Sequence, residues 1–328
     1  MLRWKCFLAN NSIGWLTRAV LKGKSNASLA LGLVIAVALW GGNNAGTKWL
    51  VGSWPPIFTG GTRFFCAGLL LLAVLRVTTW FGEYVTPSRE LSRALWWRGG
   101  VSLATYIIAF NFALRYTSAS HVALYLGASP IWALLWEAFS ERIKIGWARW
   151  SAALLALSGV GVLLAPALVG SNVSLIGELC GLMTSLLWTN YGRQSRQLSA
   201  TLNGAEVSAH TMWRAGVLLL PLALAEIVHQ GVPVNAKLLG VQSYCIVAGG
   251  VIAFALWNRA LGQWPASRVL LFNNLIPVST MTWAYFCLGE PVTPTFLLAL
   301  LLIGLGVVLG QLAASRALRT QPSPEPEL

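Results

Sequence analysis

Polar and aromatic side chains recur at helical spacing within the hydrophobic runs of this sequence. In the run at 28–51, Trp40, Asn43, Asn44 and Thr47 share one face of a helix, because residues three and four apart are neighbours there. Such side chains bind a small molecule in a cavity, or they join neighbouring helices at about 0.6 kcal/mol per pair. For each asparagine the two interpretations are evenly balanced, whereas for the whole set we favour a cavity lining. The candidate binding residues are Trp40, Asn43, Asn44, Tyr106, Asn111, Tyr125, Trp188, Tyr191, Trp257, Asn258 and Asn274.

The 17 tryptophans fall into two groups. Some lie near the ends of hydrophobic runs, where a membrane protein carries its interfacial aromatic belt. Trp40, Trp188 and Trp257 lie nearer the middle of their runs, where a belt does not explain them. Their rings are suited to stacking on an aromatic or cationic ligand.

Two arginines and a histidine also occur within hydrophobic runs. Arg63 and Arg214 either hold a carboxylate through paired hydrogen bonds or extend to the nearer interface, and we favour a structural role for both. His121 is expected near the outer mouth, as a gating residue or simply as a hydrogen-bonded one. No glutamate lies clearly at mid-run, where a proton relay in a membrane protein usually places a carboxylate. Should the chain move a solute, this leaves movement without a coupled ion, or coupling through a histidine or a glutamate near a run end.

Several kinds of catalysis are excluded. All ten acidic residues are glutamate, so no aspartate-based triad or phosphoenzyme is available, and no complete P-loop is present. The five cysteines have no C-x-x-C spacing, which argues against a metal site. We therefore expect no catalytic residues, no metal and no cofactor. Two functions other than binding and moving a small molecule stay open. One is a membrane-embedded lipid-modifying enzyme, which needs clustered acid–base groups, and the other is a non-transporting membrane scaffold.

The composition identifies an integral membrane protein. Hydrophobic residues make up 56% of the 328 residues, charged residues only 10%, and the mean hydropathy is +0.65, whereas a soluble domain carries about 25% charged residues. A helix that crosses the bilayer needs about 20 mostly apolar residues. Ten such runs predict an all-α protein with ten transmembrane helices. They lie near 28–51, 56–77, 95–114, 119–139, 147–168, 174–194, 208–229, 238–260, 266–288 and 293–315.

The basic residues predict the orientation. With both termini in the cytoplasm, 18 of the 23 lysines and arginines lie on the cytoplasmic side, and only Lys48, Arg115 and Lys237 lie outside. This asymmetry is the positive-inside rule, and it predicts a multi-pass protein of the inner, or cell, membrane. The net charge of +13 is thereby explained without a nucleic-acid partner.

The chain contains an internal repeat. A shift of 147 residues aligns 111–139 with 258–286 at ten identities in 29 positions, including Asn111 with Asn258, Pro130 with Pro277 and Trp136 with Trp283. Five runs per copy is an odd number, so the second copy enters the membrane from the opposite face. Inverted repeats of this kind place a transporter's substrate site near the midplane.

Four segments follow from this organisation. Residues 28–168 and 174–315 form the two five-helix repeats. Residues 1–27 form a basic arm, either interfacial or disordered, and residues 316–328 form a proline-containing tail expected to be disordered.

Short motifs in both halves carry a family resemblance. They are Ala38-Leu-Trp-Gly41 followed by Lys48, Arg63-Phe-Phe65 with Ala67-Gly68, Tyr116-Thr-Ser-Ala-Ser120 through Ser129-Pro130, Leu288-Gly-Glu290 and Gly304-Leu-Gly306. Over residues 28–315 the chain resembles the drug/metabolite transporter superfamily, and within it the EamA-type ten-helix exporters. It departs at Ser140-Glu141-Arg142, where the family usually has Gly-Glu-Arg.

The resemblance implies a secondary exporter of small metabolites, such as amino acids or related compounds, or of drugs. It implies alternating access without ATP hydrolysis. The expected partners are a small-molecule substrate and the lipid bilayer, and a homodimer is left open.

Overall fold

The computed structural model describes residues 5–140, 145–169, 174–261, 263–264, 269 and 271–319, and these residues are helical without a β-strand. The helices up to residue 168 are α1 (Lys5–Leu50), α2 (Pro56–Val77), α3 (Arg89–Ala94), η1 (Leu95–Gly100), α4 (Val101–Tyr116), α5 (Ala119–Gly127), α6 (Ser129–Phe139) and α7 (Trp147–Leu168). Those that follow are α8 (Leu175–Leu198), α9 (Gly204–Gln230), α10 (Ala236–Tyr244), η2 (Cys245–Ile252), α11 (Ala253–Leu261), η3 (Leu271–Leu275), α13 (Ile276–Leu288) and α14 (Pro294–Arg319).

Six segments of the described chain are long and apolar enough to cross a membrane, with lengths of 20 to 27 residues. Several crossings of one chain make a multi-pass membrane protein. These segments are Ala27–Leu50, Pro56–Val77, Trp147–Leu168, Gly204–Gln230, Ala236–Ala260 and Pro294–Ala313.

Most of the helices lie within the predicted hydrophobic runs, and two agree to the residue, Pro56–Val77 and Trp147–Leu168. The helix predicted at 95–114 begins earlier, at Arg89, because the Ser88 hydroxyl accepts a hydrogen bond from Leu91 N and caps the first turn. The helix α14 continues to Arg319, past the predicted end at 315. The tail residues 320–328 lie outside the described residues.

The run at 119–139 is not one continuous helix, as the sequence suggested, but two. The helix α5 ends at Gly127 and α6 begins at Ser129. The physical reason is Pro130, which has no N–H to donate and whose ring clashes with the carbonyl one turn earlier. The run at 266–288 shows the same pattern, since the 3₁₀ turn η3 precedes α13 and Pro277 lies in the first turn of α13.

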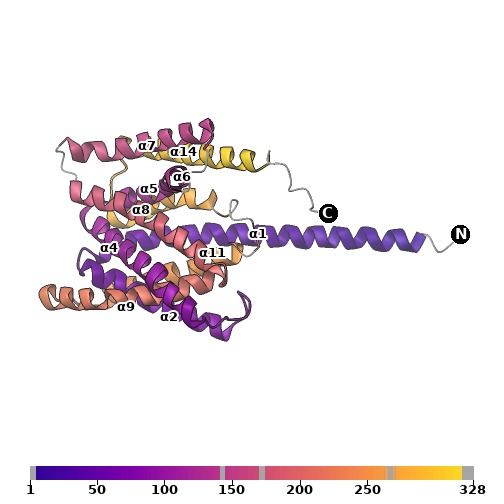
Figure 1. Cartoon of the computed structure of the whole chain (residues 1–328), viewed down its shortest axis with the longest axis horizontal. Coiled ribbons are helices and arrows are strands. Elements are labelled where there is room, and N and C mark those ends of the chain that lie inside the picture. Colours follow the sequence, from indigo (N-terminus) through magenta and orange to yellow (C-terminus); the bar gives the residue numbers. More distant parts are fainter. Residues whose placement is uncertain are drawn as a thin grey trace.

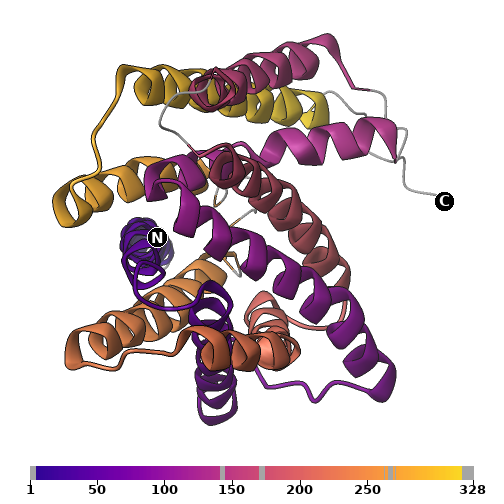
Figure 2. The same cartoon turned by 90° about the vertical axis from the view of Figure 1, so that its left-hand side faces the viewer.

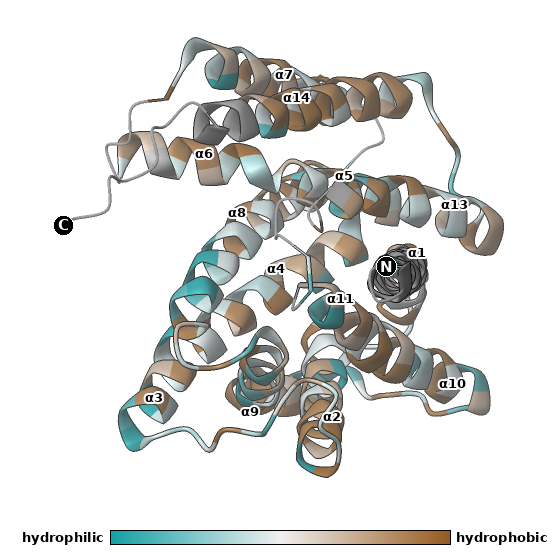
Figure 3. Ribbon diagram, turned by 90° about the vertical axis from the view of Figure 1, so that its right-hand side faces the viewer, coloured by the Kyte–Doolittle hydropathy of each residue, from teal (hydrophilic) through white to brown (hydrophobic). Residues whose placement is uncertain are grey.

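Pairs of helices from the two parts of the chain cross at small residues. The helix α2 packs on α9, where a Cβ atom added at Gly216 would lie 2.5 Å from the Phe65 Cβ and one added at Gly68 would lie 2.8 Å from the Met212 Cβ. The helices α7 and α14 pack together along one side of the molecule (Figure 1). Figure 3 shows hydrophobic residues predominating along this α7–α14 pair. Its exposed side chains, among them Leu154, Leu298 and Leu301, are suited to face lipid.

The helix α1 packs with its second half into one side of the bundle and leaves Leu31, Val34 and Ile35 exposed. Seen end-on in Figure 2, it lies between α13 on one side and α10 with α11 on the other, and it packs on all three. Its first half projects beyond the other helices (Figure 1). The proposed roles of residues 1–27 stay predictions, because residues 1–4 and the side chains of residues 5–26 lie outside the described part.

Candidate functional site

The two interrupted helices meet each other. A Cβ atom added at Gly127, the last residue of α5, would lie 3.0 Å from Cγ of Pro277 in α13. Side chains of α8 donate to carbonyls on either side of the first interruption: the Ser185 hydroxyl donates to Tyr125 O at 2.6 Å and the Thr189 hydroxyl to Ser129 O at 3.1 Å. Polar side chains therefore hold this non-helical backbone inside the bundle, as an apolar surrounding requires.

Three of the predicted aromatic residues form one ladder. The ring centroids of Tyr106 and Trp188 are 4.9 Å apart, and those of Trp188 and Tyr191 are 5.5 Å apart. Phe110 extends the ladder by stacking on Tyr106 at 5.5 Å. The Tyr191 hydroxyl lies 2.9 Å from that of Thr211 on α9. The ladder thus joins α4 and α8 and reaches α9.

Trp40 and Trp257 form a second aromatic contact, at 5.1 Å between ring centroids. The Trp40 indole donates to Gly249 O and its ring meets the edge of Phe254. Phe254 and Trp188 pack against the same core cluster. That Trp40, Trp188 and Trp257 line one cavity with the other candidate residues stays a prediction.

Arg63 is almost fully buried, at 4% exposure, and it does not extend to an interface. Its Nη1 donates to Asn43 Oδ1 at 3.2 Å and to the Thr47 hydroxyl at 2.8 Å. The guanidinium also lies 5.5 Å from the ring centroid of Phe110, at the end of the ladder. Within the described residues no carboxylate pairs with it. The buried guanidinium is therefore stabilised by neutral hydrogen-bond acceptors and by aromatic ring faces, in place of water or a carboxylate.

Arg214 has a different environment. It donates to the carbonyl of His210 and to the Ser92 hydroxyl, and it lies over the ring of Trp213. His210 in turn lies 3.3 Å from the Tyr84 hydroxyl. These contacts fix the 78–94 loop and the start of α3 against α9, which fits the structural role favoured from the sequence.

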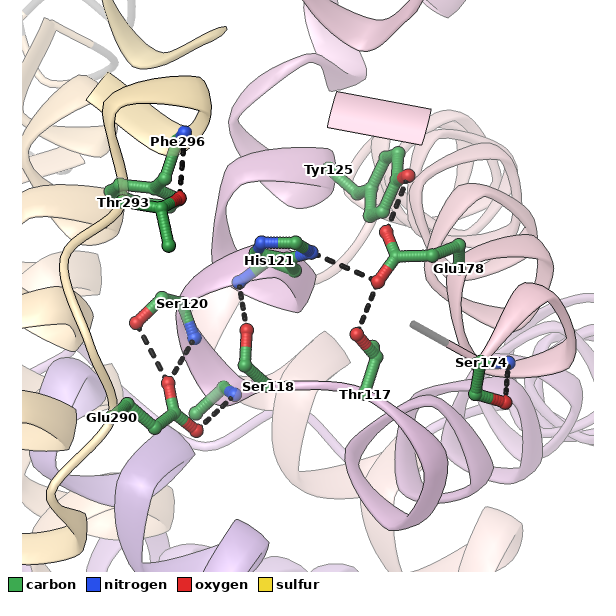
Figure 4. A network of polar contacts seen from close by, with 12 residues as sticks. Thr117, Ser118, Ser120, His121, Tyr125, Ser174, Glu178, Glu290, Thr293 and Phe296 are labelled. Atoms are coloured by element: carbon green, nitrogen blue, oxygen red, sulfur yellow. Dashed lines mark hydrogen bonds and ion pairs between the residues drawn. The ribbon is translucent and has the colours of Figure 1, made fainter. Parts of the chain in front are cut away.

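His121 belongs to a polar network around a buried carboxylate, shown in Figure 4. Its Nδ1 lies 2.9 Å from Glu178 Oε1. The Tyr125 hydroxyl donates to Glu178 Oε2 at 2.7 Å, and the Thr117 hydroxyl donates to Oε1. The Glu178 side chain has no exposed surface. One carboxylate of α8 therefore accepts from groups on α5 and from the residue that follows α4.

A second carboxylate holds the first turn of α5. Glu290 accepts from Ala119 N at 2.7 Å, Ser120 N at 3.2 Å and the Ser120 hydroxyl at 2.8 Å (Figure 4). A negative group is favourable here, because the first N–H groups of a helix lack partners within the helix. Nearby, Lys48 Nζ donates to Leu114 O in the last turn of α4 and to Thr117 O just after that helix.

The asparagines mostly serve the helices themselves. Asn111 Nδ2 donates to Ile107 O and Asn258 Nδ2 donates to Phe254 O, each at 2.8 Å and one turn back on its own helix. Asn44 Nδ2 donates to the Thr280 hydroxyl on α13, and Asn274 Nδ2 lies 3.5 Å from Gln311 Oε1 on α14. These contacts favour the helix-joining interpretation for Asn44, whereas Asn111 and Asn258 bond within their own helices.

A groove of about 420 Å³ borders the far end of the interrupted α5–α6 segment. It lies between α6 and α8, and the Arg193 guanidinium lies 4.1 Å from the ring of Trp136 at its wall. The network of Figure 4 occupies the beginning of the same segment. The groove is lined by Trp132, Leu135, Trp136, Phe139, Ser140, Leu186, Leu187, Thr189 and Asn190.

The structure brings together predicted residues from different helices in three groups. These are Tyr106 with Trp188 and Tyr191, Trp40 with Trp257, and Asn43 with Arg63. His121 and Tyr125, which are neighbours on α5, both contact Glu178. Glu178 and Glu290 were not among the predicted site residues, because both lie near run ends. The sequence did contain a signal for the first of them, because Glu178 lies in the first turn of one apolar helix and His121 in the first turn of another.

Comparisons with known proteins bear on the whole chain. The model of the EamA-like transporter family matches residues 27–165 and, a second time, residues 175–310. The uncharacterized transporter YwfM of Bacillus subtilis (strain 168) is 27% identical over 307 residues, covering 90% of this chain and 96% of that protein. A probable amino-acid metabolite efflux pump of Salmonella typhimurium is 20% identical over 284 residues, covering 84% and 92%.

A solved crystal structure is similar in fold, with a TM-score of 0.59 at 22% identity; the match covers 89% of this chain and 99% of that one. The fold and the two family matches agree with the resemblance noted from the sequence motifs. The multi-pass helical chain described above belongs to the EamA-like transporter family.

Proposed function

We propose that this chain is a secondary transporter that exports small organic molecules by alternating access, without hydrolysing ATP. The observation that carries the proposal is the contact between two interrupted helices at Gly127 and Pro277. Pro130 and Pro277, which cause the interruptions, are equivalent under the 147-residue repeat. Interrupted helices at corresponding positions of two repeats line substrate sites in secondary transporters, because their free backbone groups border a cavity.

The proposal includes ten spans arranged as two inverted five-helix repeats. The double family match supports two copies of one unit. The packing partners support a two-fold relation between them: α2 packs on α9 and α7 on α14, each on its equivalent. In the same way α1 packs on α11 and α13, while its equivalent α8 packs on α4 and on α5 with α6. Such an exchange of partners is expected when a pseudo-two-fold axis relates the halves.

The proposed binding region lies along the ladder of Phe110, Tyr106, Trp188 and Tyr191, with Arg63 at one end. The Nε and Nη2 atoms of Arg63 donate to no described residue, so its fork is open to a carboxylate. The ring faces suit an apolar or aromatic body. An amino acid with an aromatic side chain meets both requirements, and the name of the Salmonella relative supports this class.

The proposed orientation has both termini in the cytoplasm, on the evidence of the basic residues. A reporter active only in the cytoplasm, fused after Arg319, is expected to be active. A signal from the opposite side would contradict the ten-span arrangement and leave the family membership untouched.

The function is tested with purified protein in liposomes loaded with labelled tryptophan, other labelled amino acids or a labelled aromatic drug. For at least one probe, the label is expected to leave faster than from equally loaded liposomes without protein. This efflux needs no ATP, and its rate is expected to saturate as the solute concentration rises. A lipid-modifying enzyme would leave the solute inside and alter the lipid, which thin-layer analysis detects. A scaffold would do neither.

A further inference from the structure

Glu178 is the carboxylate whose burial most demands an explanation. Its side chain has no exposed surface, and it accepts from three side chains, those of Thr117, His121 and Tyr125. Of the three donors, only the histidine can carry a positive charge at physiological pH. A buried carboxylate that loses its charged partner is strongly unfavourable. The contact is an ion pair when the His121 imidazole is protonated and a neutral hydrogen bond to a buried carboxylate when it is not.

The contact joins the two halves of the chain. His121 lies on α5, within the first family match, and Glu178 lies on α8, within the second. The two sides approach closely, because a Cβ added at Gly177 would lie 2.6 Å from Tyr116 C and one added at Gly181 would lie 2.6 Å from the Tyr125 ring. The contact of His121 with Glu178 thus ties the two halves together at this end of the bundle, at the beginning of the interrupted α5–α6 segment.

The other charged groups at this end have partners of their own. Lys48 of α1 donates to Leu114 O and Thr117 O, and Arg115 of α4 donates to Val51 O and Gly52 O. Glu290, which follows α13, accepts from the first turn of α5. From α14 the neighbour is Phe296, whose ring lies parallel to the His121 ring at 6.1 Å.

We propose that His121 and Glu178 form a proton-binding site that controls the opening of this end of the transporter. With a proton on His121, the imidazolium and the carboxylate hold α5 to α8 and the end is closed. Without it, Glu178 keeps a buried negative charge and the two halves separate more readily, which returns the carboxylate to water. Closure therefore takes up one proton, and a change of one pH unit alters the opening equilibrium by up to about tenfold.

That the opening serves transport rests on the proposed function. The test of the proton-binding site itself needs no transport substrate. The full-length protein in lipid nanodiscs is studied by amide hydrogen exchange, followed in peptides that cover 119–127 and 175–181. Wild type and each variant are compared at the same pH, at about pH 5.5 and about pH 8, either side of the ordinary histidine range. Comparison at equal pH removes the intrinsic pH dependence of exchange.

The variants are His121→Gln and Glu178→Gln, with His229→Gln as the matched control because His229 is exposed near the end of α9. At about pH 5.5 both site variants are expected to exchange roughly tenfold faster than wild type in these peptides. At about pH 8 His121→Gln is expected to match wild type, whereas Glu178→Gln is expected to exchange more slowly than wild type, because it no longer buries an unpaired charge. The control is expected to follow wild type at both values.

If His121→Gln does not yield folded protein, Glu178→Gln alone provides the test, because glutamine keeps the size and most hydrogen bonds of the glutamate. Equal ratios of variant to wild type at both pH values would overturn the proposal. Absence of solute transport in liposomes would instead contradict the proposed function, and the exchange result would still stand.

Discussion

Gly127 of α5 lies directly against Pro277 of α13, so that a single added Cβ atom would come within 3.0 Å of the proline ring. Each residue stands at the interruption of a helix, and the two helices belong to different halves of the chain. Any rocking of one half against the other must therefore act on this contact. The predictions below test the contact, the packing around it and the residues proposed to bind solute.

The interruption itself is tested by Pro277→Ala. Alanine restores an N–H group and allows the helix to extend backwards into η3, so we expect solute flux to fall about tenfold while the folded yield stays normal. The matched control is Pro221→Ala, since Pro221 lies inside α9 and away from the interruptions. Flux and size-exclusion yield are measured together. Equal flux in the two variants would remove the functional argument from the interruption.

The crossing of α2 and α9 is tested by Gly68→Ala. The new methyl group would meet Trp213 N and the Met212 side chain, and overpacking of this kind costs about 1–3 kcal/mol. Gly161→Ala is the control, because no atom lies within 4 Å of its added Cβ and alanine favours a helix. We expect a lower thermal midpoint in detergent for Gly68→Ala alone. Unchanged midpoints in both variants would mean that the crossing is loosely packed.

The aromatic ladder is tested by Trp188→Ala. Loss of one stacking ring is expected to cost about 1–2 kcal/mol and to weaken the apparent affinity about tenfold, with normal expression. Trp97→Ala is the control, since Trp97 is 69% exposed. A packing residue would lower yield and activity together. Normal yield with unchanged affinity in both Trp188→Ala and Trp257→Ala would show that these tryptophans do not line the substrate cavity.

Arg63 is tested through discrimination between two solutes. Tryptophan has a carboxylate that tryptamine lacks, and hydrogen bonds to charged groups contribute about 1.5–3 kcal/mol. Arg63→Gln is therefore expected to reduce the preference for tryptophan by roughly 10- to 100-fold, and Arg63→Lys by less. Arg214→Gln is expected to lower the folded yield and leave the preference unchanged. The same preference in wild type and Arg63→Gln would show that Arg63 serves packing alone.

The positions of the helices were predictable because apolar length is a property of the local sequence, as Pro56–Val77 and Trp147–Leu168 show. The interruption near Gly127 was not predicted, although Pro130 and its equivalent Pro277 carried the signal. The pairing of His121 with Glu178 spans 57 residues and depends on how α8 packs on α5. No spacing within one helix encodes such a contact.

The asparagines were singled out from the sequence, but their contacts were not predicted. Their polarity marked them as unusual in apolar helices, but the sequence could not say which acceptor each would find. Asn111 and Asn258 bond to their own helices, and each fills the space above a glycine of a neighbouring helix, Gly60 and Gly204.

Alternating access is the central claim, and solute counterflow tests it most directly. Proteoliposomes loaded with unlabelled tryptophan are diluted into labelled tryptophan, without ATP or an ion gradient. An alternating carrier is expected to accumulate label transiently above the outside concentration, because each reorientation exchanges one internal molecule for an external one. Label that only equilibrates, or that enters no faster than in protein-free liposomes for tryptophan and for the other amino acids and drugs, would contradict the account.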